Sequence, residues 1–144
     1  MKLYIEPYKS LGPICLGMSL EQVRSELGLK YIFNEKKTIC GIHVRANDYF
    51  PEIGFKVQYN DSNKCIFIEL DDRHEVIYKE YDIFKNSCEK FISTFEKEDK
   101  NLLIDSPTII SEKFGFGIYA QNLEEDKSVL PELFSIFERG YYNG

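Results

Sequence analysis

Few residues of this chain have the types and spacing that catalysis requires. His43 lies in a strand-like run and His74 in the stretch "DDRHEV", and neither stands at the spacing of a metal site or a catalytic triad. We interpret His43 as a structural residue and His74 as a solvated turn residue. Cys15 paired with either histidine stays open as a nucleophile and base, because such partners meet in space and not in sequence.

The densest group of ionisable side chains is an acidic run at residues 69–82, "ELDDRHEVIYKEYD". Asp71 and Asp72 are adjacent, so on a strand they point to opposite faces, which disfavours an acid–base pair. The run reads as a solvated hairpin end or as a docking surface for a basic protein, with two tyrosines as aromatic anchors. The candidate partner-binding residues are Glu69, Asp71, Asp72, Glu75, Tyr78, Glu80, Tyr81 and Asp82.

Metal and cofactor sites have no motif in the sequence. Cys15, Cys40, Cys65 and Cys88 are widely spaced, without the close pairs of a zinc site, so we expect four buried, unpaired thiols. The loop "GPICLGMS" lacks the lysine of a phosphate-binding loop. We therefore expect no metal and no cofactor.

The charge of the chain restricts its partners. Of the net charge of −6, residues 1–50 carry +2 and residues 51–144 carry −8. An acidic chain repels phosphate backbones, so we expect no nucleic acid and instead a basic protein partner. No run resembles a secretory signal or a membrane span, which predicts a cytoplasmic protein without membrane contact.

Two helices are predicted from their start signals. In "GPICLGMSLEQVRSELG", Ser19 and Gln22 form a capping box, and Gly28 ends the helix as a left-handed cap. In "NSCEKFISTFEKE", Asn86 and Glu89 give a second capping box before an apolar stripe.

The remaining segments favour strands. "MKLYIEPY" predicts an edge strand, and "KYIFNEKK" and "TICGIHVR" predict a pair turning at residues 34–37. The clearest hairpin is predicted at residues 52–72, "EIGFKVQYNDSNKCIFIELDD", with its turn at "NDSN". "LLIDSPTIIS", "KFGFGIYAQ" and "LFSIFERGYY" are further extended segments, although residues 133–138 of the last fit a helix as well as the strand that we favour. Short turns force antiparallel neighbours, so the expected fold is one α+β domain over residues 1–144, a mostly antiparallel sheet with two helices on one face. The predicted core includes Val23, Leu27, Phe55, Val57, Phe67, Phe91 and Phe95.

Two stretches resemble known families. "GPICLGMSLEQVRSELG" is similar to a signature of small α+β bacterial proteins, among them the outer-membrane assembly lipoproteins and the β-lactamase inhibitor proteins. "FGFGIYAQNLEEDKSVLPELFSIFERGYY" resembles the ends of cytosolic immunity proteins that accompany polymorphic bacterial toxins. The resemblance implies a non-catalytic protein that neutralises a cognate, basic toxin by covering its working surface. A small hydrolase and a homodimeric scaffold stay open as alternatives.

Overall fold

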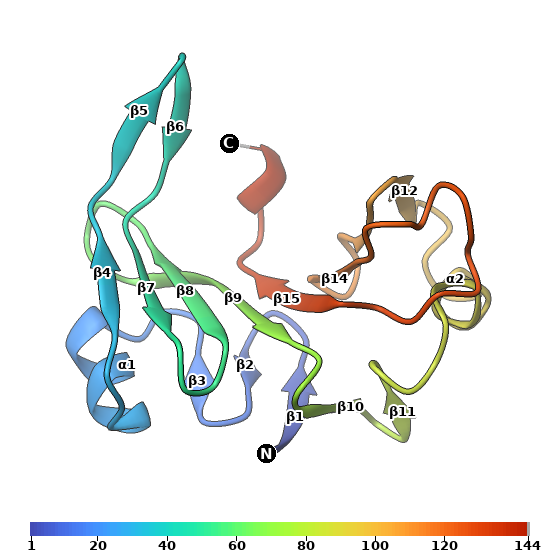
Figure 1. The fold of residues 1–144 in the computed structure, drawn as a ribbon, viewed down its shortest axis with the longest axis horizontal. Helices are drawn as coiled ribbons and strands as arrows, with labels where there is room; N and C mark the ends of the chain where they lie inside the picture. Colours follow the sequence, from blue (N-terminus) through green and yellow to red (C-terminus); the bar gives the residue numbers. More distant parts are fainter. Residues whose placement is uncertain (144) are drawn as a thin grey trace.

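An eight-stranded antiparallel sheet forms one layer of the computed structural model, which describes residues 1–143 (Figure 1). The alternation of apolar and polar residues that predicted strands also gives this sheet two different faces. The face turned to the core is called inner below, and the opposite face outer. In spatial order the strands are β12 (Leu103–Asp105), β13 (Thr108–Ser111), β14 (Phe116–Tyr119), β15 (Leu133–Phe137), β9 (Cys65–Asp71), β8 (Phe55–Tyr59), β7 (Asn47–Phe50) and β4 (Ile32–Asn34).

A smaller sheet forms part of the second layer. Its order is β11 (Tyr81–Asp82), β10 (Glu75–Tyr78), β1 (Lys2–Glu6), β2 (Ser10–Leu11) and β3 (Ile14–Cys15). The prediction of an edge strand at the N-terminus is wrong, because β1 lies between β10 and β2. The β1–β10 pair is parallel, with Lys2 opposite Glu75, and no local pattern in the sequence announces a pairing over this separation.

The two helices flank this smaller sheet (Figure 1). Helix α1 (Leu20–Leu27) has the predicted capping box at Ser19 and ends at Gly28, whose φ of 61° is left-handed. Helix α2 (Cys88–Phe95) begins one residue later than predicted, because Ser87 and not Asn86 accepts the hydrogen bond from the Lys90 amide.

One apolar core joins the two layers and confirms the α+β fold with a large antiparallel sheet. Both helices and both sheets contribute to it, and six of the seven predicted core residues are buried. Phe67 is buried on the outer face, in a small cluster with Ile66 and Phe137. Leu27 is the exception, since it is only partly buried at the end of α1.

A polar contact fixes α1 to the large sheet. The guanidinium of Arg24 donates two hydrogen bonds of 2.9 Å to the fully buried carboxylate of Asp48, and the Tyr59 hydroxyl donates a third of 2.8 Å. The hydrogen bond to Asp48 raises the pKa of Arg24. The pKa of Tyr59 is also raised, mainly because its hydroxyl is buried and secondly because it donates a hydrogen bond to Asp48.

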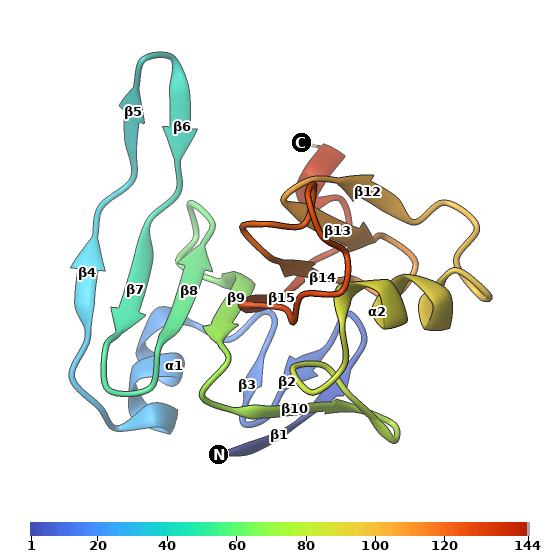
Figure 2. The same cartoon turned by 45° about the vertical axis from the view of Figure 1, so that its right-hand side comes forward.

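A long two-stranded arm, residues 31–46, extends from the large sheet (Figure 2). Its outer part is the ribbon of β5 (Lys37–Ile39) and β6 (Ile42–Val44). The predicted turn at residues 34–37 is wrong: the chain turns at Cys40 and Gly41, both with positive φ. Strand β4 pairs with β7 in a register that β5–β6 continues, so both ladders belong to one hairpin.

Candidate functional site

The arm exposes several large apolar side chains to solvent. Strand β8 pairs with β7 but not with β6, so within residues 1–143 the β5–β6 ribbon has no third strand beside it. Ile39 and Ile42, a cross-strand pair next to the turn, are 50% and 67% exposed. At the base, Tyr31, Ile32 and Phe33 are also exposed, and the Arg24 guanidinium lies 4.0 Å from the Tyr31 ring centre.

The charge of the arm is opposite to that of the rest of the molecule. Residues 31–46 contain Lys36, Lys37 and Arg45 against the single acid Glu35, a local charge of +2 with histidine neutral. Since the whole chain carries −6, the other residues together carry −8. The molecule is therefore strongly polarised, with a basic, apolar arm on an acidic body.

A groove of about 990 Å³ lies where the arm meets the body. The arm supplies one wall, which includes Phe33, the three basic residues and His43, and the turn at residues 60–63 and Tyr141 supply the other. Lys36 pairs with Asp61 across the groove at 3.3 Å, and Thr38 hydrogen-bonds His43 at 2.9 Å. The groove therefore offers cationic and aromatic groups to a bound segment.

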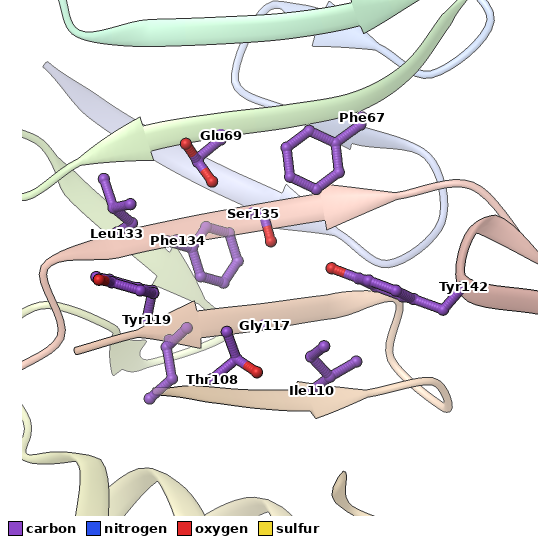
Figure 3. A pocket seen from close by; sticks show the side chains of 11 residues that line it. Phe67, Glu69, Thr108, Ile110, Gly117, Tyr119, Leu133, Phe134, Ser135 and Tyr142 are labelled. Carbon is purple, nitrogen blue, oxygen red and sulfur yellow. The ribbon is translucent and has the colours of Figure 1, made fainter. Parts of the chain in front are cut away.

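A smaller cleft of about 80 Å³ lies on the outer face of the same sheet, where strands β13, β14, β15 and β9 meet (Figure 3). Among the described residues that line it, Glu69 on β9 is the only one with a carboxylate, and Ser135 lies opposite Glu69 on β15. Aromatic side chains border the cleft at Phe67, Tyr119 and Tyr142. Burial raises the pKa of Glu69, and the charge of Lys56 on β8 acts in the opposite direction.

Tyr141 separates the groove from the cleft. Its ring stacks on Phe67 with 5.0 Å between the centroids, and its hydroxyl donates a hydrogen bond to the side chain of Gln58 on β8. Arg45 of the arm lies 5.7 Å from the centre of the same ring. The short helix Tyr141–Asn143 and the arm thus lie on the same side of the molecule (Figures 1 and 2). Tyr141 lines the groove and its ring stacks on Phe67, which lines the cleft, so the groove and the cleft are adjacent.

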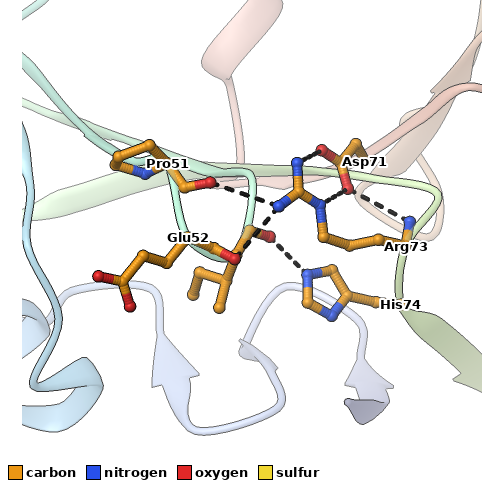
Figure 4. A network of polar contacts seen from close by, with 6 residues as sticks. Pro51, Glu52, Asp71, Arg73 and His74 are labelled. Atoms are coloured by element: carbon orange, nitrogen blue, oxygen red, sulfur yellow. Dashed lines mark hydrogen bonds and ion pairs between the residues drawn. The ribbon is translucent and has the colours of Figure 1, made fainter.

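The structure divides the predicted acidic run among several surroundings. Asp71 accepts hydrogen bonds from the Arg73 side chain at 2.8 and 2.9 Å, and Arg73 also donates to the carbonyls of Pro51 and Glu52 (Figure 4). This contact neutralises one of the predicted docking carboxylates. Asp72, Glu75 and Glu80 are exposed, whereas Glu69 lies apart from them in the cleft on the outer face.

The two predicted aromatic anchors are placed against the core. Tyr78 packs edge-on against Phe114 and Phe116, each with 5.6 Å between ring centroids, and Tyr81 packs against Phe95 at 5.1 Å. Both side chains are partly buried, and their rings pack against α2 and the large sheet. This placement differs from the exposed anchor that we expected from the sequence. Asp82 is also partly buried and lies 3.8 Å from Lys85.

In the described part of the chain, the hydrogen-bond partners of the two histidine rings are Thr38 for His43 and the Ile53 carbonyl for His74, and neither is a cysteine. His74, predicted as a solvated turn residue, is buried, and its Nε2 is hydrogen-bonded to the carbonyl oxygen of Ile53 (Figure 4). Its ring packs edge-on against Phe55. Cys40 is exposed at the tip of the arm and Cys15 is partly buried, which corrects the prediction of four buried thiols. Burial raises the pKa of Cys65 to about 12. Among residues 1–143 no cluster of three or more His, Cys, Asp or Glu is placed to hold a metal.

Sequence reasoning did not identify the arm as a functional surface. The signal was the sequence "TICGIHV", in which apolar residues are arranged symmetrically around a glycine-containing turn. Searches against protein-family models, curated proteins and solved structures return no match for this chain. No helix in the described part of the chain is both long and apolar enough to span a bilayer.

Proposed function

We propose that this chain is a non-catalytic protein that binds another protein and covers its working surface, in the manner of an immunity protein that neutralises a cognate toxin. The arm carries this proposal. A two-stranded ribbon is only marginally stable in water, and large exposed apolar side chains such as Ile39 and Ile42 commonly mark a protein interface. Both features favour a ribbon that becomes stable on packing into a partner.

Charge adds a description of the partner. The acidic body favours a partner of net positive charge, because opposite fields accelerate encounter. The basic residues of the arm require acidic groups at the place where the arm docks. The exposed carboxylates of Asp72, Glu75 and Glu80 remain proposed contacts of this kind on the body. A toxin with a cleft wide enough for the ribbon fits these requirements.

Capture from a lysate of the native host tests the arm. The bait is the full chain in three forms: unchanged, with Ile39→Ser and Ile42→Ser, and with Leu103→Ser and Ile104→Ser. The last pair is a matched control, because Leu103 and Ile104 lie on the opposite edge strand β12 and are 47% and 45% exposed. We expect the unchanged chain and the control to retain one protein that the arm variant loses.

A second step separates neutralisation from mere contact. The captured protein is expressed alone and together with each form of the chain, and growth of the host is measured. We expect growth inhibition that the unchanged chain and the control relieve and the arm variant does not. If the arm variant retains the same protein as the unchanged chain, the arm is not the contact. A chain that retains only copies of itself, seen as a dimer in light scattering, supports the homodimeric scaffold instead.

A further inference from the structure

The carboxyl group of Glu69 is partly buried in a cleft that would favour binding of a cation. Glu69 is partly buried on the outer face, and no residue in the described part of the chain forms an ion pair with it within 4.0 Å. Lys56 is its cross-strand neighbour on β8 and lowers its pKa, but desolvation is the larger effect and the pKa is raised. A half-buried carboxylate of this kind gains stability when a positive group enters the cleft.

The walls of the cleft suit a flat cation. Phe67, Tyr119 and Tyr142 border it, and aromatic faces attract positive charge. Ser135 and Thr108 add hydroxyl groups that accept hydrogen bonds. At the floor of the cleft, β14 has Gly117 and therefore no side chain. The neighbouring strand β13 leaves no room for one, because a Cβ at this position would lie 2.9 Å from the carbonyl oxygen of Ile109. The space of about 80 Å³ holds a small group and excludes a large one.

We infer that this cleft binds a guanidinium group, the side chain of an arginine that the partner presents. A guanidinium is planar and weakly hydrated, donates two parallel hydrogen bonds to one carboxylate and stacks on aromatic rings. An ammonium is more strongly hydrated and has no flat face, so it matches the ring-lined walls less well. The inference rests on the proposed function for the source of the arginine, but the chemistry of the cleft is testable without a partner.

The test is a titration of the isotope-labelled full chain, followed by the backbone amide signals in NMR spectra. The ligands are N-acetyl-arginine amide and N-acetyl-citrulline amide, which has nearly the same shape without the charge. We expect saturable shifts at Phe67, Gly117 and Ser135 with the arginine ligand, and binding about tenfold weaker or absent with citrulline.

Variants assign the effect to the cleft. Glu69→Gln is expected to weaken arginine binding about tenfold, while Glu26→Gln, the same change at an exposed position on α1, leaves it unaltered. Tyr142→Ala removes one wall at the end of the chain, outside the core, and is expected to weaken binding even if Glu69→Gln disturbs the fold. Equal binding of both ligands, or of the unchanged chain and Tyr142→Ala, overturns the inference. Because no partner is present, this result is independent of the capture experiment.

Discussion

Replacing Asp48 with asparagine tests whether the contact between α1 and the large sheet is a main support of the fold. The carboxylate of Asp48 is fully buried and accepts hydrogen bonds from Arg24 and Tyr59. Removing one member of a buried ion pair costs about 3–5 kcal/mol, since the remaining charge loses its partner. The Arg24 side chain is 23% exposed and lies over the Tyr31 ring, so it retains water and aromatic contacts. We therefore expect the lower limit, about 3 kcal/mol.

Urea unfolding measures this loss. With a slope of about 2 kcal/mol per M for a domain of this size, a loss of about 3 kcal/mol moves the midpoint down by about 1.5 M at an unchanged slope. Asp61→Asn is the matched control, because it removes the same charge from the exposed pair that Asp61 forms with Lys36. We expect no measurable shift for the control. If Asp48→Asn unfolds at the midpoint of the unchanged chain, the buried contact contributes no net stability and our reasoning is refuted.

Three further perturbations test other parts of the molecule. Phe91→Ala, which opens the core beneath α2, should lower the free energy of unfolding by about 3–5 kcal/mol in the same urea assay. A thiol reagent should label Cys40 rapidly in the native protein, and Cys65 and Cys88 only after denaturant is added, as followed by mass spectrometry. Burial raises the pKa of Glu69 above its ordinary 4.5, so its ionisation opposes folding as pH rises through this range. Glu69→Gln should therefore be more stable than the unchanged chain at pH 7, with the difference vanishing below pH 4.5, and thermal unfolding at several pH values measures it.

Features encoded within a few neighbouring residues were predictable. The capping box of Ser19 and Gln22 and the alternation of Phe55, Val57 and Tyr59 each involve one segment, so the first helix and the central hairpin follow from the sequence. The turn of the arm was misplaced because polar residues at 34–37 resemble a turn. The actual turn has Cys40 at a φ of 51°, a conformation that side chains other than glycine adopt rarely.

The candidate site depended on contacts between distant segments and was therefore less predictable. Tyr78 and His74 lie next to charged residues in the sequence, which indicates an exposed position, but the pairing of β10 with β1 places this segment against the core. Glu69 was a predicted binding residue, yet two of the three aromatic side chains that border its cleft, Tyr119 on β14 and Tyr142, come from distant segments of the chain. The charge pattern of a sequence does not show which aromatic side chains the fold places next to a charged residue.

The parallel pairing of β1 with β10 also has a consequence for synthesis on the ribosome. Lys2 is translated 73 residues before its partner Glu75. At about 5–20 residues per second, the N-terminal strand waits about 4–15 s before this partner is even translated. During that time β10 cannot cover the edge of β1 that it covers in the folded protein, where β1 lies between β10 and β2. That edge of β1 is therefore unpaired until β10 has been made, and an unpaired strand edge is open to pairing with other chains.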